Sequence, residues 1–128
     1  GLKIYDMPSG AIYVVGATAN LTCARVGTGL AEAYDGDFGV GTVTASNNNS
    51  LSSTEQNIIP TTATPQAVAG ATTAKGQSTA TENAVVDGTS TAMDVYLNFL
   101  VDLADISATD AITVNGTIDL FWINLGDY

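Results

Sequence analysis

The sequence contains no histidine, one cysteine and only three cationic residues among its 128 residues. Without histidine it lacks the commonest general base and metal ligand of proteins. A serine or cysteine nucleophile would have to be activated by carboxylates or by the few cations. Paired carboxylates can hydrolyse glycosides, but such enzymes also need aromatic walls and polar clamps, of which this chain has few. The sequence therefore predicts that the protein is not an enzyme and has no catalytic or cofactor-binding residues.

Basic residues are too few to balance the acidic ones. Lys3, Arg25 and Lys75 face thirteen Asp and Glu residues, so the formal net charge is −10. Such a surface repels the phosphate backbone of nucleic acids and the anionic surface of membranes. A signal peptide and an apolar run of membrane-spanning length are also missing from the sequence. We therefore expect neither direct nucleic-acid binding nor membrane association.

The single cysteine, Cys23, cannot form an internal disulfide bond. No histidine or nearby lysine is available to lower its pKa, so we interpret it as a small buried hydrophobic residue in a strand. Folding in a reducing cytoplasm is the simplest inference.

Two groups of acidic residues are candidates for a metal site. Asp35 and Asp37 flank Gly36 and could fold onto a hard cation such as Ca²⁺, but the further ligands of an EF-hand loop are missing. We interpret them as an acidic turn, and we interpret a second group as a solvated acidic loop: Asp102, Asp105 and Asp110. The sequence therefore predicts no metal site.

Two C-terminal segments alternate between apolar and polar residues, as half-buried strands do. The run from Asp110 to Leu125 alternates for ten residues before the second face becomes apolar as well. Asn115-Gly116 could instead close a hairpin, but that pairing would set apolar against polar residues at every rung. We predict one straight strand, with Gly116 at a bulge or a close backbone approach. The second strand, Met93 to Val101, is then an antiparallel neighbour or lies in a facing sheet, because the connection is too short for a parallel crossover.

The N-terminal half has further strand patterns. Leu2 to Asp6 and Ala11 to Val15 flank a Pro-Ser-Gly turn, which predicts a hairpin or a corner. Ala17 to Val26 predicts a half-buried strand of small residues, and Phe38 to Ala45 predicts a strand whose glycines indicate tight packing or a bulge.

The segment from Ser50 to Thr91 is rich in Ser, Thr, Ala and Gly, and no aromatic residue occurs between Gly39 and Val95. A structureless loop of this length argues against a compact domain. We expect short edge strands within one long excursion, although an extended arm on a partner is the alternative. The expected strands are the Thr-Ala-Thr run before Pro65, Gln66 to Ala69 and Ala84 to Val86, split by Pro65, Gly70, Gly76 and Gly88. Residues 1–128 then form one all-β domain, an antiparallel, jelly-roll-like β-sandwich of eight to ten strands.

Four segments carry a resemblance to a known family. These are Tyr34 to Thr42, Asn57 to Ala63, Val95 to Phe99 and Val114 to Asp127. In them the chain resembles the head decoration, or cement, proteins of tailed bacteriophages. The resemblance implies a β-sandwich or jelly-roll module, with no catalytic residues, that is made in the host bacterial cytoplasm and binds the outside of the capsid. It also implies the major capsid protein as partner and a homo-oligomer, with a trimer favoured and a dimer as the alternative.

A different class of function is also open. A receptor- or glycan-binding module of a phage fibre or bacterial adhesin could use exposed Tyr5, Tyr13 or Tyr34 to stack on sugars. Trp122 stands in an apolar row, and we interpret it as a core residue rather than a ligand platform.

Overall fold

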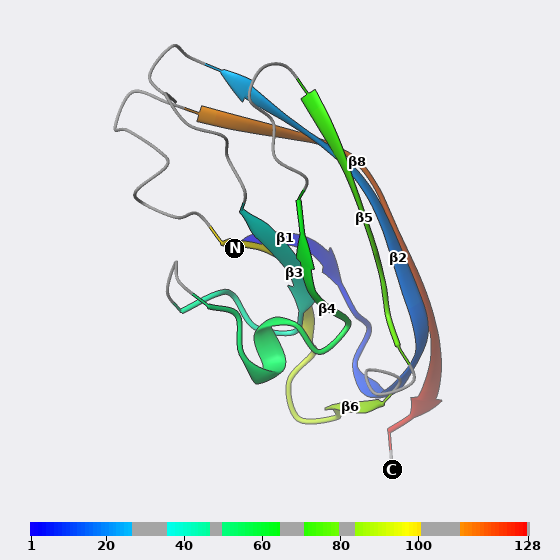
Figure 1. Ribbon diagram of the computed structural model, residues 1–128. Helices are drawn as coiled ribbons and strands as arrows, with labels where there is room; N and C mark the ends of the chain where they lie inside the picture. The colour runs from blue at the N-terminus through cyan, green and yellow to red at the C-terminus, as the bar shows by residue number, and fades with distance from the viewer. Residues whose placement is uncertain (27–35, 47–49, 65–70, 80–83, 101–110, 128) are drawn as a thin grey trace.

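The computed structural model describes residues 1–26, 36–46, 50–64, 71–79, 84–100 and 111–127, which form two antiparallel sheets packed face to face (Figure 1). The first sheet has the strand order β1 (Leu2–Asp6), β7 (Asp94–Leu100), β3 (Asp37–Gly41) and β4 (Ile59–Ala63). In the second sheet the central strand is β2 (Gly10–Val26), with β8 (Ala111–Gly126) on one side and β5 (Ala71–Gln77) and β6 (Val85–Gly88) on the other. The predicted all-β sandwich is confirmed.

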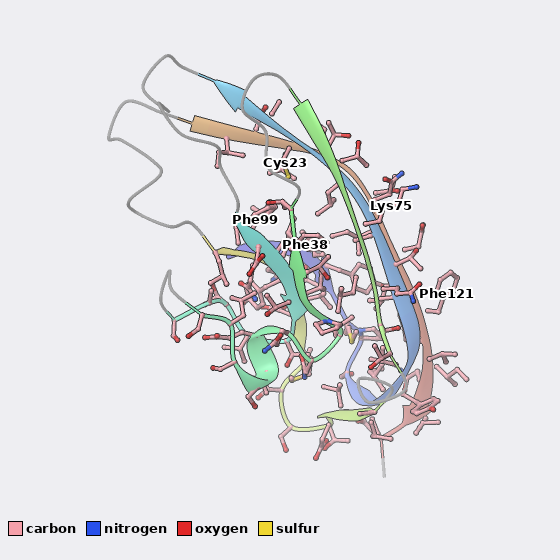
Figure 2. All side chains as sticks on the ribbon, viewed as in Figure 1. Cys23, Phe38, Lys75, Phe99 and Phe121 are labelled. Atoms are coloured by element: carbon pink, nitrogen blue, oxygen red, sulfur yellow. The ribbon has the colours of Figure 1, made fainter. Side chains whose placement is uncertain are left out.

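The core lies between the sheets and draws on both. β2 contributes small and branched side chains, and β3 and β7 contribute larger ones opposite them. Phe38 and Phe99 face each other from adjacent strands, with ring centroids 6.2 Å apart (Figure 2). The largest fully buried apolar side chains are Phe38, Ile12, Ile58, Ile59, Val14, Val40 and Val95.

β2 is one strand where the sequence predicts two. Val14 pairs with Trp122 and Gly16 pairs with Phe121, so Val15 is an extra residue in β2 and forms a bulge. The bulge exchanges the faces of the strand, because even-numbered residues point into the core before it and odd-numbered residues do so after it. In the sequence this exchange of faces looks like a strand break. The predicted burial of Ala19, Leu21 and Cys23 is confirmed.

The chain passes between the sheets at two predicted places. The Pro-Ser-Gly turn is a corner and not a hairpin, because β1 pairs with β7 in the first sheet and β2 belongs to the second. β7 and β8 likewise lie in facing sheets, which is one of the two arrangements expected for them.

The middle segment supplies strands to both sheets. β4 and β6 overlap the predicted Thr-Ala-Thr and Ala84–Val86 strands, whereas Gln66 to Ala69 lies outside the described residues. β5 is not among the predicted strands, because Gly76 is predicted to separate strands and instead lies within one. A Cβ atom at Gly76 would lie only 2.8 Å from Cζ of Phe38, so the glycine allows the two sheets to approach each other.

The third strand is shorter than predicted. β3 ends at Gly41, and the next amide, that of Thr42, bonds to the carbonyl oxygen of Thr54 at 2.8 Å instead of continuing the ladder. Thr54 belongs to a single 3-10 turn, η1 (Ser53–Glu55), which packs so closely on β3 that a Cβ atom at Gly41 would overlap its backbone. The tight packing predicted for these glycines is therefore confirmed.

The predicted C-terminal strand is one continuous strand with no hairpin at Asn115-Gly116. β8 runs antiparallel to β2 from the Val26–Ala111 pair to the Ala11–Gly126 pair (Figure 1). Gly116 has φ +151°, and a Cβ atom there would overlap the carbonyl oxygen of Asn20, as a close backbone approach requires. The side chains on the predicted apolar face are half-buried and form the inner row of β8: Ile112, Val114, Ile118, Leu120 and Trp122.

Candidate interaction surface

The sandwich is open on one side. β1 ends the first sheet and β8 ends the second, and each pairs with one strand among the described residues, β1 with β7 and β8 with β2. The inner row of β8 is only half-buried, whereas Ala17, Ala19 and Leu21 at the centre of the same sheet are fully buried. The first sheet therefore covers β2 completely and β8 only in part.

An apolar groove of about 590 Å³ lies on this open side, between β1 and β8. One wall is the inner row of β8, and the other comes from the first sheet. Leu2, on β1, is 66% exposed in this wall, and Ile4 and Tyr5 beside it are exposed too. We call this the β1–β8 groove, and its lining comprises Leu2, Ile4, Tyr5, Leu21, Leu97, Phe99, Ile112, Val114, Asn115, Gly116, Ile118 and Leu120.

The opposite face of β8 carries a second apolar surface, the outer ridge of Phe121, Ile123 and Leu125. Phe121 is 56% exposed and points away from the first sheet (Figure 2). Its cross-strand neighbour is Gly16, which has no side chain to cover the ring. Exposed apolar residues that gather in one place mark interaction sites on soluble proteins more often than single scattered ones do.

Charge is nearly absent from β8, where Asp119 is the one ionisable residue between Ala111 and Gly126. On β1 Lys3 bridges Asp6 and Asp94, and its Nζ lies 3.1 Å from Oδ1 of Asp94. The hydrogen bond from Lys3 lowers the pKa of Asp94, and those to Asp6 and Asp94 raise the pKa of Lys3. None of these three charged residues is part of the groove lining, which contains no ionised side chain at neutral pH.

The acidic residues do not converge on a cation site within the described residues. Asp37 lies half-buried at the start of β3, and Asp35 lies outside the described part of the chain, as do Asp102, Asp105 and Asp110. Across the described ranges no group of three or more His, Cys, Asp or Glu side chains could hold a metal ion. Cys23 is buried as predicted, and burial raises the pKa of its thiol.

The aromatic residues considered for sugar stacking occupy different places. Tyr5 is exposed beside the β1–β8 groove, 6.4 Å from Trp122 between ring centroids, and Trp122 faces the core as interpreted. Tyr13 is half-buried in β2, and Tyr34 lies outside the described residues. The structure therefore brings Tyr5 and Trp122 together.

Neither apolar surface is among the sites that the sequence predicts. The signal for the outer ridge was present, because the alternation fails at Phe121, where both faces of the strand become apolar. The groove has no local signal, since it depends on which strands end the two sheets.

In the described part of the chain no helix is long and apolar enough to cross a membrane. Comparison with protein-family models, curated proteins and solved structures finds no match for this chain.

Proposed function

We propose that the protein is a structural component of a virion, a cement that binds the outer surface of a tailed-phage capsid and joins neighbouring major capsid subunits. The observation that carries the proposal is the pair of apolar surfaces on opposite faces of β8, the groove and the outer ridge. A cement must contact more than one neighbour, and two separate surfaces on one small module meet that need. The resemblance of four sequence segments to decoration proteins supplies the identity of the partner.

The physical role follows from linkage. A ligand that binds the assembled shell better than the broken one stabilises the shell, and many copies that each bridge subunits add avidity. A net charge of −10 keeps the free module soluble before it binds. In this proposal the protein is made in the host cytoplasm and acts on the capsid exterior as a homo-oligomer, without contacting the packaged nucleic acid.

A glycan-binding module is the second candidate, and the exposed Tyr5 ring at the groove favours it. Sugar recognition also needs several hydrogen-bonding groups around a stacking ring. Within the described lining, Asn115 and Tyr5 alone carry polar side-chain groups. The groove is thus better suited to apolar side chains of a protein than to a saccharide.

Co-sedimentation tests the proposal. Tailed-phage heads would be stripped of bound protein and titrated with the purified chain. We expect saturable binding in a fixed ratio to capsid subunits, and greater resistance of the refilled heads to heat or chelator treatment. Absence of binding at micromolar concentrations, together with binding to a glycan array, would overturn the cement assignment in favour of the second candidate.

A further inference from the structure

The outer edge of β8 is long and unpaired among the described residues. The strand has 16 residues, which corresponds to about 54 Å at the usual rise per residue. One edge is hydrogen-bonded to β2 along its whole length, so the N–H and C=O groups of alternate residues point outward from the other edge. Such an edge is a template for another strand.

Every other edge strand in the described part of the chain carries a feature that discourages pairing. β4 contains Pro60, β5 contains Lys75, and β6 has only four residues. β1 has Lys3 and an extra residue, Ile4, between the pairs that flank it. β8 has no proline and no lysine. Each of its residues from Ala111 to Asn124 has a partner in β2, and the one extra residue along this stretch, Val15, lies in β2, so among the described edges this one is best suited to association.

We propose that β8 pairs antiparallel with β8 of a second copy of this chain, about a two-fold axis at Ile118, and joins the two second sheets into one. The pattern of β8 favours a second copy as occupant, because its half-buried apolar inner row would meet the same row of the other copy, and the charge distribution sets where the two copies can approach. Two chains of charge −10 repel each other, and they can approach only where charge is sparse, as it is along β8 with its single Asp119.

Charge and length also select the register. In an antiparallel pair about a two-fold axis, directly opposed residues share a face, so an axis at a residue sets apolar rows together. An axis at Asp119 would set the two Asp119 carboxylates opposite each other. An axis at Ile118 instead sets Asp119 opposite Thr117 of the other copy, and the two β8 strands still pair over nearly their whole length. The inner rows then meet with Val114 opposite Trp122, and they cover the open mouth of the β1–β8 groove.

This inference deepens the proposed function by naming a partner for its open side, and it favours the dimer over the trimer. Sedimentation equilibrium of the full chain tests it without capsids. We expect a reversible species of twice the 13.0 kDa chain mass. Thr117→Asp places a carboxylate opposite Asp119 of the other copy, and the two-fold symmetry makes two such pairs. The dimer dissociation constant should therefore rise about tenfold, whereas Thr117→Lys should lower it by a similar factor.

The matched controls are Thr73→Asp and Thr73→Lys, which change charge equally on an exposed position of β5, away from the β8 edge. They should leave the dimer constant nearly unchanged, and circular dichroism should show native β-structure in all four variants. A monomer at all concentrations, a trimer, or a dimer that responds equally at both positions would overturn the inference. Capsid co-sedimentation is scored separately, so a dimer that does not bind heads contradicts only the cement assignment, and a monomer that binds them contradicts only the pairing.

Discussion

The side-chain amide of Asn98 donates a hydrogen bond to the backbone carbonyl of Glu55 at 2.8 Å, and both residues are buried, with 0% and 4% of their surface exposed. Asn98 also donates to the carbonyl of Val43 at 2.9 Å and accepts from the amide of Ala45 at 2.8 Å. One side chain of β7 therefore satisfies three backbone groups in the segments that follow β3.

We expect Asn98→Ala to lower the free energy of unfolding by about 2–4 kcal/mol, because it leaves the buried carbonyl of Glu55 and two part-buried backbone groups, those of Val43 and Ala45, without this partner. Urea unfolding followed by circular dichroism measures the change. The control is Asn20→Ala on the exposed face of β2, which should cost well under half as much. Equal costs at the two positions would show that the network does not stabilise the fold.

Glu55 should make stability depend on pH. Its carboxylate accepts hydrogen bonds from Ser46, including the amide at 2.8 Å, and from the amide of Ser52 at 2.9 Å, and these lower its pKa from the ordinary value of 4.5. A group with a lowered native pKa stabilises the fold above its unfolded pKa, and this contribution is lost as the pH falls through the native value. The advantage of wild type over Glu55→Gln should therefore be largest near neutral pH and shrink in acid.

Urea unfolding midpoints of wild type and Glu55→Gln, measured from neutral to acid pH, give this difference in stability. Ser52→Ala, which removes only the hydroxyl contact, should show a smaller effect of the same sign. A wild-type advantage that stays constant with pH would contradict the assignment.

Gly116→Ala should destabilise the protein by about 2–4 kcal/mol, because it combines a positive φ with overlap of the Asn20 carbonyl oxygen. Thermal unfolding gives the shift in midpoint. Gly16→Ala is the matched change on the partner strand, where a Cβ atom would meet only Oγ of Ser78 at 3.3 Å. We expect a cost below about 1 kcal/mol there, and the reverse order would refute the close approach at Gly116.

Cys23 should resist thiol reagents in the folded protein. It is buried and its pKa is raised by burial, so both access and thiolate formation are suppressed. Since the chain has one cysteine, the release of a chromophore from a disulfide reagent reports this site alone. We expect labelling at least about a hundredfold slower than in urea. Equal rates in the two states would mean that this end of β2 is open.

The long C-terminal strand was predictable because ten residues of alternation and the mismatched rungs of the competing hairpin both depend on nearby sequence. The sequence did not allow the prediction that β2 is a single strand. A one-residue bulge at Val15 and a true strand break give the same local pattern, and only β8, about a hundred residues away, spans both sides of it.

The polar network and the interaction surface needed the tertiary structure for the same reason. Asn98 alternates with core residues and could equally have faced solvent, and it is buried because the segments after β3 fold over it. The outer ridge can be read from the sequence as a change in pattern at Phe121. The groove exists only because β1 and β8 end their sheets on the same side of the sandwich.

The central claim is that the outer ridge of β8 contacts the capsid, and the binding of ridge variants to capsids tests it most directly. Phe121→Ala removes an exposed ring from the outer ridge, and Val85→Ala removes a side chain of similar exposure, 57%, from β6 in the same sheet. The dissociation constant for stripped heads should rise about tenfold or more for Phe121→Ala and stay within about twofold of wild type for Val85→Ala. Equal affinities for wild type and both variants would contradict the claim.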